Sequence, residues 1–312
     1  EKEILNSLEW LGLNWDEGPI FQSSRFDLYR EYAEKLVAKG LARRERDPAK
    51  GPGEAIIFKM PSRKIVLEDM IYGRIEFDSD LLKDQVLIKS DGHPAYNFAC
   101  VVDDAEMRIN PVLRGEDHLS NTPKQIALYE ALDLPVPRFA HVPLILGQDR
   151  SRLSKRHGAT SVTSYKDDGY LSQALVNYLV LLGWSPGNDQ EIFTLDELVK
   201  SFDLDKVSRK GAAFSMEKLE WMNAHYLRRL SPPDLTAAVK PFLVQSGIPE
   251  AAASNGKLEA VARLLQERMH LLKDIVALGS CFFQDVVFDE AAAQKNLLKK
   301  ENGPMLARLK EL

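Results

Sequence analysis

The chain has 312 residues, of which 45% are hydrophobic, enough for roughly two or three domains with cores of their own. It has no run of about 18 apolar residues, no signal peptide, and two distant cysteines, Cys100 and Cys281. These features argue against a membrane protein, a disulfide framework and a cysteine-rich zinc site. A formal net charge of −5 argues against a nonspecific nucleic-acid coat but leaves room for one basic face. We expect a soluble, intracellular protein.

The first residues, EKEILNSLEWLG, have a helical pattern, because Ile4, Leu8 and Leu11 recur at helical spacing before Gly12. No capping residue precedes this pattern. We therefore expect the chain to begin inside a helix of a longer protein. The helical ending MLARLKEL leads to the same expectation for the C-terminus.

Segment 26–91 combines one helix with short strands. The stretch FDLYREYAEKLVAKG predicts an amphipathic helix with Leu28, Tyr32 and Leu36 on one face and Gly40 at its end. Prolines and glycines make RRERDPAKGPGEA a loop, whereas AIIFKM, KIVLEDMIYGRIEF and QVLIKS are β-like runs. The pattern indicates a small insertion of mixed α/β character.

The next segment predicts a parallel sheet. AYNFACVVDDAEM reads as a helix, INPVLRGED as a strand running into a loop, and RFAHVPLILG as a buried strand. Between the strands a helix is expected, with Thr122 as N-cap, Pro123 at its first position and Gln125 completing a capping box. Strand, helix and strand with this crossover favour a parallel pair, whose carboxyl ends are where ligands bind. The loops RGEDHLSNT and GQDRSRLSKRHGA both fall at that edge.

After Tyr165 helical patterns dominate. Apolar residues recur through 171–182 at spacings of four, three and four, and Gly183 ends this helix. Further helical patterns follow in FTLDELVKSFDLDKV and SMEKLEWMNAHYLRRL. SPPDL, residues 231–235, indicates a boundary because two adjacent prolines cannot lie inside a helix.

The most unusual stretch is DRSRLSKRHGAT, residues 149–160, which is rich in basic side chains. Lys155 and Arg156, followed by Gly158, could neutralise the phosphates of a nucleotide. The loop matches neither the Walker motif nor the G-x-G-x-x-G motif. An ordinary basic surface loop remains the alternative to a phosphate-binding loop.

Two residues on neighbouring elements could bind a polar ligand. Arg114 ends a buried strand, a position that suits bidentate capture of a carboxylate. The structural alternative is a salt bridge with Glu116 or Asp117. Tyr96 could donate its hydroxyl to a ligand, and its alternative is a place in the core.

Taken together, these segments resemble bacterial or organellar glutamyl-tRNA synthetases, a family of class I aminoacyl-tRNA synthetases. RLSKR, residues 152–156, matches the form that this family uses for the class I KMSKS loop. VLRGEDHLSNTPKQIALYEALD, DGHPAYNFACVVDD and HVPLILGQDRSRLSKRHGATSV are similar to it almost position by position. ILNSLEWLGLNWDEGP and QSSRFDLYREYAEKLVAKGLA resemble its earlier segments, so the likeness covers nearly the whole chain.

The resemblance implies an α/β fold, in which a class I synthetase nucleotide-binding (Rossmann-like) parallel sheet carries an α/β insertion and is followed by all-helical domains. Residues 1–25 and 92–148 would form the nucleotide-binding catalytic domain, with its first part missing. Residues 26–91 would be the insertion that binds the tRNA acceptor end. Residues 149–230 would form the helical domain that contacts the tRNA stem and carries the KMSKS-type loop. Residues 231–312 would begin the helical anticodon-binding domain.

The activity implied by the resemblance is that of a glutamate–tRNA ligase. The α-carboxylate of L-glutamate attacks the α-phosphate of ATP to give glutamyl adenylate and pyrophosphate, and the terminal ribose hydroxyl of tRNA-Glu then takes the glutamyl group. Mg²⁺ would accompany ATP, and no zinc is expected because residues 26–91 contain no cysteine. The implied protein is a monomer in the cytoplasm or an organellar matrix and has no membrane partner.

The resemblance also implies roles for individual residues. Stabilisation of phosphate charge during catalysis would fall to Lys155, Arg152 and Arg156. The ATP site would comprise Asp117, Ile145, Arg152, Leu153, Ser154, Lys155 and Arg156. The glutamate pocket would contain Tyr96, Arg114 and Cys100, the last with a small buried thiol as its alternative. Contacts with tRNA phosphates would come from Arg209, Lys210 and Lys218.

One family motif is missing, and it keeps two alternatives open. None of the six histidines begins the His-x-Gly-His-like motif that cradles ATP, and the segment expected to carry it would precede Glu1. A non-catalytic tRNA-binding fragment or pseudoenzyme is therefore the first alternative. The second is a synthetase paralogue that glutamylates a modified tRNA base. That group lacks an anticodon domain, so the helical segment from Ser231 onwards argues against it.

Overall fold

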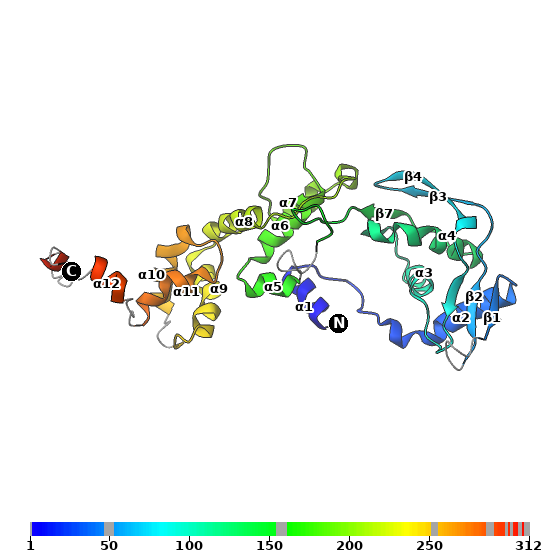
Figure 1. Cartoon of the computed structure of the whole chain (residues 1–312), viewed down its shortest axis with the longest axis horizontal. Coiled ribbons are helices and arrows are strands. Elements are labelled where there is room, and N and C mark those ends of the chain that lie inside the picture. Colours follow the sequence, from blue (N-terminus) through cyan, green and yellow to red (C-terminus); the bar gives the residue numbers. More distant parts are fainter. Residues whose placement is uncertain are drawn as a thin grey trace. The chain divides into compact units, whose positions relative to one another are not determined.

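A computed structural model describes residues 2–46, 53–153, 161–250, 255–284, 290–296, 299, 302–304 and 308 (Figure 1). The chain forms two compact units, the first made of Glu1–Thr163 and Leu175–Met216 and the second of Ser164–Ala174 and Glu217–Leu312. The first unit is mixed α/β and the second is helical, so the predicted fold class is confirmed. Among the described residues, no helix is both long and apolar enough to cross a bilayer.

A three-stranded antiparallel sheet lies in the first part of the chain. Its order is β1-β2-β5, formed by Ala42–Glu45, Ala55–Phe58 and Gln85–Ile88. Helix α2 (Phe26–Ala38) packs against this sheet through the buried face that the sequence predicted, which includes Tyr32 and Leu36. The helix α1 (Lys2–Trp10) precedes it, as expected.

Strand β1 corrects the prediction that Arg43 begins a loop. Residues 42–45 pair with β2 in regular antiparallel register. Two side chains of the strand also form ion pairs, Arg43 with Asp84 at 2.6 Å and Arg44 with Glu34 at 2.5 Å. Cross-strand pairing thus extends into a stretch whose composition, with prolines and glycines close behind, is typical of a loop.

The second sheet carries the predicted parallel pair. Its order is β4-β3-β7-β6, and β6 runs parallel to β7 with helix α4 between them in the chain, as expected from the sequence. The run KIVLEDMIYGRIEF is not one strand but an antiparallel hairpin, whose first strand pairs in parallel with β7 (Figure 1). Segment 26–91 therefore contributes two strands to the sheet that contains the parallel pair. The elements are β3 (Lys64–Asp69), β4 (Gly73–Asp78), α3 (Tyr96–Glu106), β6 (Val112–Gly115), α4 (Thr122–Ala131) and β7 (Phe139–Val142).

The predicted capping box at the start of α4 is wrong. A short 3-10 helix, η3 (Glu116–Asn121), leads into α4, and the N-cap is Asn121, which makes no side-chain capping bond. The Thr122 hydroxyl contacts Arg114 and His141 instead, and the Gln125 amide donates to Asn97 at 3.3 Å. Buried tertiary partners have taken both side chains away from the helix terminus.

The remaining helices of the first unit lie where the sequence predicted helical patterns. Helix α6 (Ser172–Gly183) begins in the second unit and continues into the first. Helix α7 (Leu195–Ser201) has a true capping box, in which Thr194 accepts from the Glu197 N–H at 3.2 Å and the Glu197 carboxylate accepts from the Thr194 N–H at 2.7 Å.

The second unit is a set of helices around its own core. The prolines of SPPDL open helix α9, with Ser231 as the N-cap, so they separate two helices as predicted. The core includes Leu235, Val239, Leu258 and Ile275, all fully buried. The helices of this unit are α5 (Val162–Asp167), α8 (Met216–Arg229), α9 (Pro232–Gln245), α10 (Asn255–Leu265), α11 (Asp274–Gly279) and α12 (Glu290–Asn296).

Gly169 allows a close approach of two backbone segments in the second unit. Its φ is +89°, its carbonyl accepts from the Leu272 N–H at 2.9 Å, and an added Cβ would lie 2.8 Å from the Lys273 nitrogen. We expect Gly169→Ala to lower the free energy of unfolding by about 2–4 kcal/mol, because backbone strain and a steric clash add.

Gly247→Ala is the matched control, since Gly247 has φ +94° but open space where the Cβ would lie. It should lower the free energy of unfolding by only about 1–2 kcal/mol. Urea unfolding followed by circular dichroism compares the two variants. Equal losses would show that the close backbone contact at Gly169 contributes nothing.

Candidate active site

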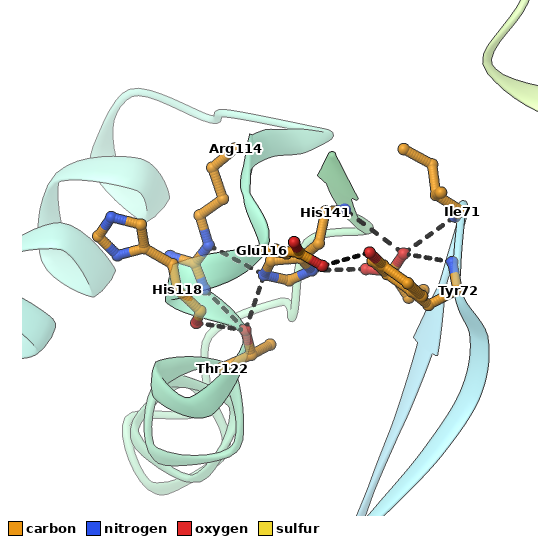
Figure 2. Close-up of polar contacts among 8 residues, drawn as sticks. Ile71, Tyr72, Arg114, Glu116, His118, Thr122 and His141 are labelled. Atoms are coloured by element: carbon orange, nitrogen blue, oxygen red, sulfur yellow. Dashed lines mark hydrogen bonds and ion pairs between the residues drawn. The ribbon is translucent and has the colours of Figure 1, made fainter. Parts of the chain in front are cut away.

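Arg114 lies at the carboxyl end of β6, where the sequence predicted a ligand-binding residue. Its Nε donates to Nε2 of His141 at 3.2 Å, and its Nη2 donates to the Thr122 hydroxyl at 2.8 Å (Figure 2). The guanidinium carbon also lies 5.4 Å from the centre of the Phe139 ring. Burial lowers the pKa of Arg114 from its ordinary value of 12.5, yet the side chain stays cationic. The strand thus presents a fixed positive charge.

The structural alternative for Arg114, a salt bridge with Glu116 or Asp117, is wrong. The Glu116 carboxylate accepts from the Tyr72 hydroxyl and from the Leu144 N–H, the latter at 3.0 Å. The Asp117 carboxylate pairs with Arg152 at 3.2 Å. Among the described residues, Arg114 forms no ion pair. Its charge is therefore available for an acidic ligand.

Two of the predicted glutamate-pocket residues, Tyr96 and Cys100, lie on one face of α3, which they share with Asp104. Tyr96, Cys100 and Asp104 are spaced by four residues, which places them in a row along the helix. Tyr96 and Cys100 both lie within electrostatic range of Arg114. Burial raises the pKa of the Cys100 thiol, so this side chain is a neutral group.

Tyr96 is not a core residue, which removes its structural alternative. Its side chain is 53% exposed, and its hydroxyl lies 3.4 Å from Nδ1 of His118. The two rings are tilted, with centres 5.7 Å apart. Nδ1 of His118 also lies 3.2 Å from the amide nitrogen of Asn121. The side chain of Tyr96 is therefore exposed beside His118, a neighbour that the sequence missed.

A buried pair behind Arg114 was also missed by the sequence. His141 is fully buried on β7, and its Nδ1 lies 2.6 Å from Oδ2 of Asp69, the last residue of β3. Burial lowers the pKa of His141, and this effect outweighs the opposing effect of Asp69. Burial alone would raise the pKa of Asp69, but hydrogen bonds from His141, Tyr72 and Ile71 hold it below its ordinary value. The pair is thus a carboxylate beside a neutral imidazole.

The segment before the basic loop is folded back on itself. Ile145 accepts through its carbonyl from the Leu153 N–H at 3.1 Å, and Leu146 forms an isolated bridge with Arg152. Residues 212–214 hold Leu146 through hydrogen bonds of 3.0 and 2.8 Å. Four predicted ATP-site residues, Asp117, Ile145, Arg152 and Leu153, therefore lie on connected segments. Ser154, Lys155 and Arg156 lie outside the described residues.

The residues predicted to contact tRNA are on the surface. Arg209 and Lys210 are exposed in the first unit, and Lys218 is exposed on α8 of the second. Their role in RNA binding stays a prediction. In the described part of the chain, no group of three or more His, Cys, Asp or Glu side chains could hold a metal ion.

Comparison with known proteins gives the family. The catalytic-domain model of the class I tRNA synthetases (E and Q) matches residues 1–50 and 47–221, and an anticodon-binding domain model matches residues 234–312. The chain belongs to this class I tRNA synthetase family, which confirms the resemblance expected from the sequence.

Individual relatives are glutamate–tRNA ligases. The chain is 44% identical to the glutamate–tRNA ligase of Oleidesulfovibrio alaskensis, over 97% of this chain and 72% of the relative. It is 46% identical to that of Syntrophotalea carbinolica, over 95% and 70%. Among solved structures it is similar to a glutamate tRNA ligase from Elizabethkingia meningosepticum in complex with its amino acid, with a TM-score of 0.83 and 32% identity over 99% of this chain and 75% of the other.

Asp104, on the same face of α3 as Tyr96 and Cys100, carries a pH-dependent charge. Burial raises its pKa to about 6, an effect that Arg114 opposes. In the unfolded chain an aspartate has a pKa of about 3.9, so between about pH 4 and pH 6 only the folded protein holds this proton. The free energy of unfolding should therefore fall as the pH rises through that window.

We expect Asp104→Asn to remove this fall and to be more stable than the wild type at pH 8 by on the order of 2 kcal/mol. Urea unfolding at pH 4.5 and pH 8 measures the difference. Asp27→Asn, at an exposed carboxylate of α2, is the control and should keep the wild-type pH dependence. An unchanged pH dependence in Asp104→Asn would contradict the assignment.

Proposed function

We propose that this chain acts as a glutamate–tRNA ligase, which activates L-glutamate with ATP and transfers it to the 3′ end of tRNA-Glu. The observation that carries the proposal is the cation of Arg114, which stands at the carboxyl end of a parallel strand without an acidic partner among the described residues. The 44–46% identity to glutamate–tRNA ligases supports the same activity. A partly buried arginine of this kind is suited to an acidic substrate.

In the proposed pocket, Arg114 would hold a carboxylate of glutamate, and Tyr96 and Cys100, which influence its charge, would contact the substrate beside it. The guanidinium of Arg114 and the hydroxyl of Tyr96 would position the substrate, and positioning is a large part of the catalysis of adenylate formation. Asp104, when ionised, adds negative charge near Arg114 and would weaken carboxylate binding. Glutamate affinity is therefore set by the balance of these charges.

The ATP half of the reaction is assigned to the segment that leads into the basic loop. The α-carboxylate of glutamate attacks the α-phosphate, the phosphorus–oxygen bond to the β-phosphate breaks, and pyrophosphate leaves. Arg152, Lys155 and Arg156 would stabilise the negative charge on the phosphates, and Asp117 holds Arg152 at that edge of the sheet. Mg²⁺ bound with ATP would neutralise further phosphate charge.

Different segments of the chain would bind different parts of tRNA-Glu. Residues 26–91 would bind the acceptor end of tRNA-Glu, 149–230 its stem, and 231–312 would begin the anticodon-binding domain. The anticodon-binding match over residues 234–312 supports the last of these and disfavours the base-glutamylating paralogue. Arg209, Lys210 and Lys218 would contact RNA phosphates. We propose a monomer that works in the compartment of its tRNA, the cytoplasm or an organellar matrix.

Glutamate-dependent exchange of labelled pyrophosphate into ATP tests this function. Lys155→Ala should lower the exchange rate by about 100-fold or more, because one charge-stabilising donor is lost, while tRNA-Glu binding stays within about 2-fold. Arg150→Ala removes an exposed charge from the same basic stretch and should keep wild-type exchange. Unchanged exchange in Lys155→Ala would refute the assignment. A wild-type chain that binds tRNA-Glu but exchanges no pyrophosphate would favour the non-catalytic alternative.

A further inference from the structure

We infer that Asp69 and His141 are positioning residues for Arg114, because the carboxylate fixes a neutral imidazole tautomer whose free nitrogen orients the guanidinium without neutralising its charge. This inference rests on the proposed function, in which Arg114 binds a carboxylate of glutamate. Neither residue reaches the pocket surface, since His141 is fully buried and Asp69 is 4% exposed. They would act on the substrate only through Arg114.

The contacts of His141 fix which of its ring nitrogens carries the proton. The Nε of an arginine can only donate a hydrogen bond. Nε2 of His141 lies 3.2 Å from this Nε and 3.0 Å from the Thr122 hydroxyl, which can donate to it, so Nε2 must be the accepting nitrogen and carry no proton. A neutral imidazole then has its proton on Nδ1, which donates to Oδ2 of Asp69 at 2.6 Å. The contact with Arg114 thus requires one of the two tautomers.

Asp69 selects that tautomer because its carboxylate is held by other donors. Its Oδ1 accepts from the backbone N–H groups of Ile71 and Tyr72, both at 2.9 Å (Figure 2). Its Oδ2 has no proton to offer when the carboxylate is ionised, so it can only accept from His141. Every bond from Arg114 through His141 to Asp69 therefore runs in one direction. The turn between β3 and β4 supplies the fixed donors that set this direction.

The neighbours of Arg114 orient its guanidinium without neutralising its charge. A carboxylate in place of His141 would orient the guanidinium equally well, but it would pair with the cation and compete with the substrate. The neutral imidazole and the Thr122 hydroxyl hold Nε and Nη2 instead. In the described part of the chain, Nη1 of Arg114 makes no hydrogen bond. The arrangement leaves both this donor and the positive charge for the ligand.

Asp69→Asn tests the inference with almost no change in shape. The oxygen of the new amide must face the N–H groups of Ile71 and Tyr72, which turns its NH₂ group toward Nδ1 of His141. Nδ1 must then accept, and the imidazole proton moves to Nε2. Two donors now face each other at Nε of Arg114, so the guanidinium loses one of its two orienting hydrogen bonds and keeps the one to Thr122. We expect glutamate affinity to fall by about 10-fold or more, the scale of one hydrogen bond to a charged group.

Two substitutions of His141 separate positioning from a purely structural role. The amide nitrogen of His141→Asn can take the place of Nδ1 and keep the bond to Asp69, but it offers nothing to Arg114. The amide oxygen of His141→Gln can take the place of Nε2 and accept from Arg114. If the role is positioning, the glutamine variant should bind glutamate at least about 5-fold more tightly than the asparagine variant, since it keeps a hydrogen bond to a charged group. The reverse order would show that only the anchor to Asp69 matters.

The control is Asp103→Asn, at another buried carboxylate of the same unit. Asp103 accepts from the Tyr29 hydroxyl at 2.8 Å and pairs with Arg25 at 2.9 Å, and it makes no contact with Arg114. This variant measures the general effect of neutralising a buried acid. It should keep glutamate affinity within about 2-fold of the wild type, because it leaves the bonds of Arg114 intact.

The closing experiment combines ¹⁵N NMR of the histidine and arginine side chains with calorimetric titration of L-glutamate, on the whole chain. We expect His141 to carry its proton on Nδ1 in the wild type and on Nε2 in Asp69→Asn, with weaker glutamate binding only in the variant. A wild-type proton on Nε2, or unchanged glutamate affinity in Asp69→Asn, would overturn the inference. A wild type with the expected tautomer but no glutamate binding would count against the proposed function instead, and the NMR result would still decide the orientation of Arg114.

Discussion

The hydrogen bond between Asp69 and His141 is the contact on which the rest of the site depends. It joins the end of β3 to β7, and His141 in turn contacts Arg114 on β6, so one buried chain of polar groups crosses three strands. Buried polar groups are stable only when their hydrogen bonds are satisfied, and each contact from Nε of Arg114 through His141 to Asp69 joins a donor to an acceptor. The sheet can therefore hold the cation of Arg114 at its carboxyl edge without an ion pair among the described residues.

The sequence predicted the frame of this site because the frame follows from local patterns. The apolar runs and crossover length around β6, α4 and β7 gave the parallel pair, and helical spacing gave α2 and α3. The errors arose where distant residues overrode local preference. Thr122 looks like a helix cap but bonds to Arg114 and His141, and Arg43 looks like the start of a loop but pairs within β1. A local sequence pattern includes neither the buried partners of Thr122 nor the strand that pairs with Arg43.

The site itself was only half predictable for the same reason. Arg114 and Tyr96 were found because their positions, at the end of a buried strand and the start of a helix, suit ligand binding. His141 carried one usable signal, a polar residue within the otherwise apolar run RFAHVPLILG. Asp69 had none, since its partner lies 72 residues away and the two meet only through strand pairing. The elevated pKa of Asp104 likewise depends on burial that the sequence does not reveal.

The central claim is that Arg114 keeps its charge and one terminal nitrogen for a carboxylate of glutamate while His141 holds its orientation. A crystal structure of the chain with L-glutamate tests it most directly. The account predicts a carboxylate oxygen about 3 Å from Nη1 of Arg114, with the contact from Nε to His141 unchanged. Glutamate bound elsewhere, or an Arg114 side chain that has turned away from His141 to reach it, would contradict the account.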